Sequence, residues 1–456
     1  MYFCRMNKII IFIFLFFRIA NCVSQNMANS AMIEQKSTEL YIAHNWAELI
    51  NYGNEAIAQG YDYFYLRMRI GIAYYEQKKY MKGVRHFEKA VQFNSSDKVA
   101  LEYLYYSYVF SGRNNEARAL KSMFSERMLD LLKPPSNKIF ESLYCEGGIA
   151  LSNQNNIYKN IDLNGPSNIY GAALITNNMH YWHVGLNHQL GNKLSVYEGF
   201  CNINIDMASK ISANNKDTLD NYTLTQNDYY LSPNYQFKYF SISPAIHFIN
   251  VNFGKLNAYR INNTHRYAFT KKDTTFSNYA TSLSITKNIG IYSYNLTGGF
   301  SQLNGYNQIQ TGLSLTYYPL TNTDFYGTSS LVYLNENYTN RFIVIQKIGL
   351  KLAPKLWAEA GITYGDLQNY CENNAFVVYN TGDKILYKYG FSIVSPLLKH
   401  VEFSLRYDSF YKENTYDRTD QKMKYVYGLP NYFLETESIT INYKTQTIIG
   451  GIKWKF

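Results

Sequence analysis

The feature that most constrains this chain is a change of period near residue 138. From there to Phe456, apolar and polar residues alternate with a period of two, which places successive side chains on opposite faces of a β-strand. One example is the run Ile-Gln-Thr-Gly-Leu-Ser-Leu-Thr-Tyr over residues 309–317. The pattern predicts an antiparallel β-structure of about 14 strands, within a range of roughly 12 to 16, over residues 139–456.

Alternation of this kind fits a soluble β-sandwich as well as a membrane barrel. Only 17% of the residues are charged, while 17% are aromatic and 46 are Tyr. Aromatic residues gather at both interfaces of a membrane barrel, and here they lie near many predicted strand ends. Examples are Tyr181, Trp182, Tyr292, Tyr294, Tyr317, Tyr318, Trp357, Tyr364, Tyr407 and Tyr411. Past the N-terminus no stretch offers the roughly 18 apolar residues of a spanning helix, so these observations favour crossing by strands.

The C-terminus carries a second sign of a membrane barrel. Apolar residues and glycine alternate with Lys453 and Lys455 up to the last residue. The alternating set is Ile448, Gly450, Ile452, Trp454 and Phe456. It resembles the terminal signal of outer-membrane barrels, which implies recognition by the barrel-assembly machinery and a last strand that closes the barrel.

Connections between the predicted strands are of two kinds. Short turns are expected at residues 191–193, 288–290 and 353–355. Long loops are expected in four polar segments, at residues 206–226, 252–275, 365–384 and 412–437. Short periplasmic turns and long external loops are typical of outer-membrane barrels.

Residues 30–132 have a helical pattern that repeats every 34 residues, as in stacked helix-turn-helix pairs. The central unit resembles the tetratricopeptide repeat, in which small residues let helices approach and larger ones fill the gap. The residues expected to pack in this way are Gly71, Tyr74, Gly83, Phe87 and Ala90. Pro134 and Pro135 end the helical pattern, so residues 133–138 are predicted to be a linker.

Residues 1–24 are interpreted as a secretory signal, because Arg5 and Lys8 precede a short apolar run and small residues follow it. Cys22 leaves open a lipoprotein box instead. A nucleic-acid partner is not expected, since residues 30–131 carry 13 basic and 12 acidic side chains. The three later cysteines have no CxxC spacing, so neither a disulfide framework nor a zinc site is indicated.

No catalytic or cofactor motif is found, so the sequence predicts neither an enzyme nor a bound cofactor or metal. The cluster His180, His183 and His188 is interpreted as interface or lumen histidines, since 183 faces away from the other two on a strand. Charged residues on the polar strand faces are predicted to point into the lumen. They are Lys347, Lys351, Glu402, Arg406 and Asp408, and they either neutralise one another or select a polar solute or glycan.

A leader, a short helical repeat array and a barrel rich in Tyr and Asn together resemble the YaiO family of outer-membrane β-barrel proteins. The resemblance implies the outer membrane of a Gram-negative bacterium, contact with its lipid, and a helical domain in the periplasm. Transport or export, with a polysaccharide as one candidate cargo, is the function favoured, with the repeats holding a periplasmic protein partner. A structural or adhesive surface barrel and a lipid-modifying enzyme are the alternatives.

Overall fold

The computed structural model describes residues 29–134, 138–158, 163, 169–213, 216–261, 266–426 and 429–456. The predicted leader, with Cys22, lies outside the described residues, as do residues 135–137 of the predicted linker. The chain forms two compact units. The first holds the helices before residue 136, together with residues 319–323, and the second is the β-barrel formed by the rest of the chain. The predicted class, helical repeats followed by an antiparallel barrel, is confirmed at the level of helices and barrel.

The helical unit begins with a helix over residues 29–42. The helices that follow are α2 (Trp46–Ala58), α3 (Phe64–Glu76), α4 (Tyr80–Phe93), α5 (Lys98–Phe110), α6 (Asn114–Leu120), a 3₁₀ turn (Lys121–Met123) and α7 (Glu126–Leu132). Helices α2, α4 and α6 start at residues 46, 80 and 114, which is the 34-residue interval of the sequence pattern. Asp97 caps α5, because its carboxylate accepts a hydrogen bond from the Ala100 amide at 2.8 Å.

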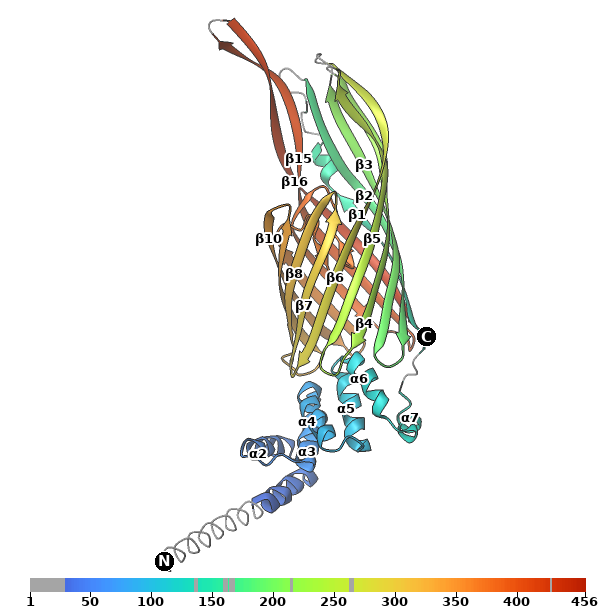
Figure 1. Ribbon diagram of the computed structural model, residues 1–456, viewed down its shortest axis with the longest axis vertical. Helices are drawn as coiled ribbons and strands as arrows, with labels where there is room; N and C mark the ends of the chain where they lie inside the picture. The colour runs from blue at the N-terminus through green and yellow to red at the C-terminus, as the bar shows by residue number, and fades with distance from the viewer. Residues whose placement is uncertain are drawn as a thin grey trace, which may run out of the picture. The chain divides into compact units, whose positions relative to one another are not determined.

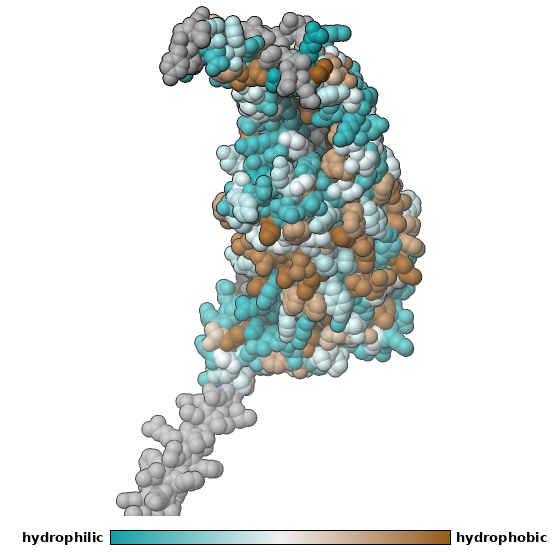
Figure 2. Space-filling view, turned by 45° about the horizontal axis from the view of Figure 1, so that its top comes forward, coloured by the Kyte–Doolittle hydropathy of each residue, from teal (hydrophilic) through white to brown (hydrophobic). Residues whose placement is uncertain are grey.

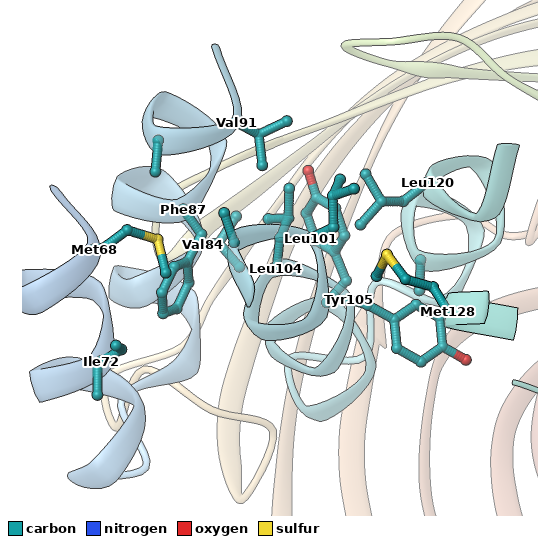
Figure 3. Close-up of a cluster of buried hydrophobic side chains, with 14 residues drawn as sticks. Met68, Ile72, Val84, Phe87, Val91, Leu101, Leu104, Tyr105, Leu120 and Met128 are labelled. Carbon is teal, nitrogen blue, oxygen red and sulfur yellow. The ribbon is translucent and has the colours of Figure 1, made fainter. Parts of the chain in front are cut away.

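Apolar side chains from α3 to α7 meet in one core, shown in Figure 3. Phe87 and Ala90 of α4 are fully buried in it. Close approach of α3 and α4 depends on glycine, because a Cβ on Gly71 would stand 2.6 Å from the Phe87 ring. Gly83 lies against the backbone of Gly71, and a Cβ there would be 3.3 Å from the Gly71 carbonyl oxygen. Burial of this core stabilises the unit in the way expected of stacked helical hairpins.

Fourteen strands form a closed antiparallel barrel (Figure 1). They are β1 (Phe140–Ser152), β2 (Tyr170–Leu190), β3 (Leu194–Ala213), β4 (Lys216–Gln236), β5 (Ser241–Arg260), β6 (Tyr267–Ile289), β7 (Tyr292–Leu303), β8 (Tyr306–Tyr317), β9 (Phe325–Glu336), β10 (Thr339–Ala353), β11 (Leu356–Tyr364), β14 (Lys384–Ser395), β15 (Val401–Val426) and β16 (Leu429–Lys455). Each pairs with the next along the chain, with β14 beside β11, and β16 closes the barrel against β1. We call the end with the β2–β3 and β10–β11 turns the turn end and the other the loop end.

The closing seam joins the two ends of the barrel sequence. Cys145 is paired with Ile452, Gly147 with Gly450, and Leu143 with Trp454. The apolar members of the predicted terminal set face outward, since Ile448, Ile452, Trp454 and Phe456 are each about half exposed. The register therefore puts this set on the exterior of the last strand, while its role in assembly stays a prediction.

Exposed apolar side chains cover the barrel exterior, and Figure 2 shows them gathered around the lower part of the barrel in that view. On β10 the outward residues Phe342, Val344 and Ile348 are 48–62% exposed, whereas the intervening Ile343 is fully buried. A water-soluble surface avoids an apolar belt of this extent, and lipid tolerates it. No helix in the described part of the chain has the length and apolar content to cross a bilayer.

Three of the four predicted long loops are wrong. Residues 206–226, 252–275 and 412–437 mostly continue the strands, so β15 and β16 stay paired from Val401–Trp454 out to Val426–Leu429. Polar residues there do not end the strands, because a ladder that projects beyond the lipid can expose polar groups on both faces. Of the fourth predicted loop, 365–384, all but the last residue does leave the barrel wall, between β11 and β14.

Candidate functional site: the lumen of the barrel

The chain between β11 and β14, residues 365–383, folds into the barrel, and we call it the inward segment. It contains a two-stranded hairpin of β12 (Cys371–Glu372) and β13 (Val377–Val378). Leu367, Asn369 and Tyr370 are at most 2% exposed, which is unlike a solvated loop. Its side chains and backbone contact strands on all sides of the lumen.

The base of the inward segment is held by Arg341 of β10. The guanidinium donates a hydrogen bond to the carbonyl oxygen of Gln368 at 2.7 Å and lies 3.5 Å from the carboxylate of Asp366. Arg341 also pairs with Glu336 at 2.9 Å, and Glu336 accepts a hydrogen bond from Asn369 at 3.1 Å. A charged network of this kind fixes the point where the chain turns inward.

An apolar contact lies beside this network. Leu367 and Tyr370 of the segment pack in one cluster with Leu334 of β9 and Ile343 and Ile345 of β10. Inward-facing aliphatic residues are unusual in a water-filled barrel, whose interior is polar. The segment supplies the apolar surface against which they are buried.

An ionic contact holds the middle of the segment. The carboxylate of Glu372, 4% exposed, lies 2.6 Å from the ammonium of Lys388 on β14 and 3.9 Å from that of Lys347 on β10. It also accepts a hydrogen bond from the Tyr379 hydroxyl at 2.7 Å. Removing one partner of such a buried pair leaves the other charge without compensation.

The tip of the segment, Asn374 to Phe376, reaches the opposite wall. Tyr230 of β4 donates a hydrogen bond to the carbonyl oxygen of Asn374 at 3.2 Å, and Nδ1 of His247 on β5 lies 2.7 Å from that of Ala375. The Asn374 amide nitrogen donates to the Ser243 carbonyl at 3.1 Å. The Phe376 ring lies 5.1 Å from the Tyr230 ring. The segment therefore spans the lumen from β10 to β4 and β5.

A second piece of chain supports the end of the segment. Helix α8 (Gln154–Tyr158) follows β1, and its Tyr158 hydroxyl donates a hydrogen bond to Asn414 of β15. Asn414 and Tyr443 both donate to the carboxylate of Asp383. This chain of hydrogen bonds ties the segment to α8 and to the last two strands.

A cavity of about 540 Å³ remains in the lumen beside the inward segment. Of the predicted lumen residues, Lys347, Arg406 and Asp408 line it, with Arg406 and Asp408 3.2 Å apart. Lys351 and Glu402 do not line it, because they lie nearer the turn end. There Lys351 is 3.4 Å from Asp324, and Glu402 is 3.0 Å from Lys455.

Sequence reasoning missed Glu146, Asp228, His247 and Glu372, all of which also line the cavity. The sequence does show that these residues are charged or ionisable. It does not show which of them lie close together inside the barrel, because that depends on the register of the strands. His183 also faces the cavity, where its Nε2 lies 2.9 Å from the Tyr197 hydroxyl, whereas His188 lies 2.8 Å from Glu198. Within the described residues no group of His, Cys, Asp or Glu is arranged to hold a metal ion.

No protein-family model and no curated protein sequence matches this chain. Among solved structures, the toluene transporter TodX of Pseudomonas putida has a TM-score of 0.40 and 8% identity, covering 72% of this chain and 92% of TodX. A Pseudomonas aeruginosa FadL homologue has a TM-score of 0.39 and 10% identity, covering 77% and 94%. The outer membrane protein Omp33 of Acinetobacter baumannii has a TM-score of 0.32 and 7% identity, covering 70% and 99%. Sequence identities and TM-scores as low as these assign no activity to this chain.

Proposed function

We propose that this chain is an outer-membrane transport protein of a Gram-negative bacterium whose lumen is closed at rest by the inward segment. The observation that carries the proposal is the segment itself, which crosses the lumen and leaves a cavity lined by ionisable groups. A solute path uses charged walls of this kind for selection, and here they border the part of the lumen that the segment leaves open. The apolar exterior supports the location in a membrane.

The barrel topology supports an orientation. Strand β1 begins and β16 ends at the turn end, so the chain enters the barrel at that end. Short turns face the periplasm in outer-membrane barrels. The helical unit is therefore proposed to be periplasmic, where its hairpins offer a surface for a protein partner.

The size of the cavity bears on the solute. A volume of about 540 Å³ is that of a small-molecule site. Passage of a polysaccharide chain would require the inward segment to leave the lumen. We therefore favour a small polar solute, with polysaccharide export as the second possibility.

The test is conductance of the purified full-length protein in a planar bilayer. Replacing residues 367–381 with a short Gly/Ser linker should raise single-channel conductance by roughly tenfold or more, because the obstruction is removed while the wall remains closed. The matched control shortens the β15–β16 hairpin by removing residues 422–433, which lie beyond the part of β15 paired to β14. This control should leave conductance unchanged.

Two results would contradict the proposal. One is equal conductance of the wild type and the linker variant. The other is absence of conductance in both, with each protein migrating as a folded, heat-modifiable barrel on a gel. The first result would show that the inward segment does not close the lumen, and the second would leave the barrel as a structural element of the membrane.

A further inference from the structure

Two buried side chains on neighbouring strands line the cavity, and each has a polar atom without a hydrogen-bond partner. Asp228 of β4 is 5% exposed and His247 of β5 is 4% exposed, and both line the cavity. Oδ1 of Asp228 and Nε2 of His247 make no hydrogen bond. A buried polar atom left in this way is costly, and strain, a bound water or ion, or a ligand accounts for it.

The His247 ring is oriented by its contact with the inward segment. Its Nδ1 lies 2.7 Å from the carbonyl oxygen of Ala375, which can only accept, so Nδ1 donates this hydrogen bond. The other ring nitrogen, Nε2, lies 3.6 Å from Oδ2 of Asp228, beyond hydrogen-bond distance. Gln226 donates to Asp228 Oδ2 at 3.0 Å but does not reach Oδ1.

Charge is unevenly distributed around the cavity. Lys347, Lys388 and Arg406, on β10, β14 and β15, each lie within 4 Å of a carboxylate. Among the described residues, no lysine or arginine comes this close to Asp228, and the ionisable side chain beside its carboxylate is that of His247, at 3.6 Å. A ligand that brings both positive charge and N–H donors would complement this carboxylate.

Aromatic rings stand next to Asp228 and His247. The Tyr230 ring lies 5.6 Å from the His247 ring, and Phe376 of the inward segment lies 5.1 Å from Tyr230. Aromatic faces attract organic cations and cover apolar carbon. A bare metal ion is disfavoured, because no group of three or more His, Cys, Asp or Glu side chains in the described chain is placed to ligate one.

We propose that the lumen binds a small organic ammonium ion, whose N–H groups donate to Asp228 and His247 and whose carbon part packs against Tyr230 and Phe376. This inference rests on the proposed transport function, because the ammonium ion would be the transported solute. Binding of the ion does not itself require the barrel to conduct. Because Phe376 and the Ala375 carbonyl belong to the inward segment, the ligand is bound where the segment meets the wall.

Calorimetry on the folded full-length protein in detergent tests this with three probes of similar shape: cyclohexylammonium, cyclohexanol and cyclohexanecarboxylate. The ammonium should bind at least about tenfold more tightly than the other two, because only it supplies both charge and donors. Equal binding of the alcohol and the ammonium would overturn the proposal in favour of an apolar site. Preferred binding of the carboxylate would also overturn it.

Variants locate the site. Asp228→Asn should weaken ammonium binding by about tenfold or more, and His247→Gln should do the same, because its amide can donate to Asp228 in place of the ligand. Asp206→Asn, on β3 outside the cavity lining, should bind like the wild type. Unchanged binding by both folded lumen variants would overturn the assignment, and the wild-type probe series decides the question if neither variant folds.

Conductance measured on the same preparation separates this inference from the proposed function. A protein that binds the ammonium but conducts nothing in any variant contradicts only the transport function. A protein that conducts after removal of residues 367–381, yet in its wild-type form binds all three probes equally, contradicts only the ammonium site.

Discussion

In the helical unit the most buried side chains are aliphatic or aromatic, such as Leu49, Leu66 and Phe87, whereas in the barrel many are polar, such as Asp228 and Glu372. The difference follows from what surrounds each unit. The helices bury their apolar faces against one another. The barrel turns its apolar face outward, so its interior is filled by hydrogen-bonded and charged groups.

Buried side chains therefore contribute to stability in different ways in the two units. In the helices, deleting an apolar side chain leaves a cavity. In the lumen, deleting a charge leaves its partner uncompensated. Substitutions of equally buried residues should therefore change stability for different reasons in the helical unit and in the barrel.

One of the two largest effects is expected at Phe87. Phe87→Ala should lower the free energy of unfolding of the helical unit by about 3–5 kcal/mol, because the ring is fully buried between α3 and α5. Chemical denaturation of residues 25–133, followed by circular dichroism, measures it. Phe93→Ala on the same helix, where Phe93 is 46% exposed, should cost much less. Equal losses would contradict the proposed core.

The same contrast appears in the barrel at Glu372. Glu372→Gln should destabilise the closed inward segment by about 3–5 kcal/mol, because Lys388 then loses its buried partner. Hydrogen exchange followed by mass spectrometry should show at least about a hundredfold loss of protection over residues 367–380.

The matched control for Glu372 is Glu437→Gln on the β15–β16 hairpin. Glu437 lies 2.9 Å from Arg418, but its side chain is 61% exposed, so the pair should contribute at most about 1 kcal/mol. If both variants exchanged alike, the inward segment would not depend on its ionic contact.

Sequence predicted the two units well because each has a clear period. The 34-residue interval reappears in the starts of α2, α4 and α6, and the period of two reappears in the strands. The path of the four polar segments was not predictable from composition, because Asn, Asp, Thr and Tyr occur equally in projecting strands and in loops. Buried apolar residues do not mark the inward segment either, since Leu367 and Tyr370 are buried there but Ile211 and Tyr416 are also buried in the projecting strands.

The sequence of β10 contained an indication of the inward segment. Ile343 and Ile345 interrupt the alternation of β10, and the structure buries both against Leu367 and Tyr370. An apolar residue on an expected lumen face thus indicates something packed in the lumen. The pairing of Glu372 with Lys388 could not be inferred, since it depends on where the segment turns across the barrel.

A smaller effect, dependent on pH, is expected in the helical unit at His86. Burial, with Arg67 and Arg85 nearby, lowers the pKa of His86 to about 3. The unfolded chain has a histidine pKa of about 6.5, so stability is complete above that pH and falls by about 1.4 kcal/mol per pH unit as the pH decreases toward 3. Between pH 7 and pH 5, denaturation of residues 25–133 should show a loss of about 2 kcal/mol.

Two variants check that His86 is the source of this pH dependence. His86→Gln removes the titrating group, so the loss between pH 7 and pH 5 should largely disappear. His44→Gln changes an exposed histidine of the same unit and should leave the loss in place. If the loss of stability between pH 7 and pH 5 persists in His86→Gln, another group is responsible for it.

The smallest effect compares two glycines at the ends of the inward segment. Gly365, where the chain leaves β11, has φ +131°, and a Cβ there would stand 2.5 Å from the Phe342 carbonyl oxygen. Gly365→Ala should therefore destabilise the closed segment by about 1–2 kcal/mol, through strain and through displacement of the β10 backbone. Gly382, at the other end, has open space around the same position, so Gly382→Ala should change stability by less than about 0.5 kcal/mol. Hydrogen exchange over residues 367–380 should increase by roughly tenfold in the first variant and stay unchanged in the second. The opposite order would mean that the segment is not held by the turn at Gly365, and that its hinge lies next to β14.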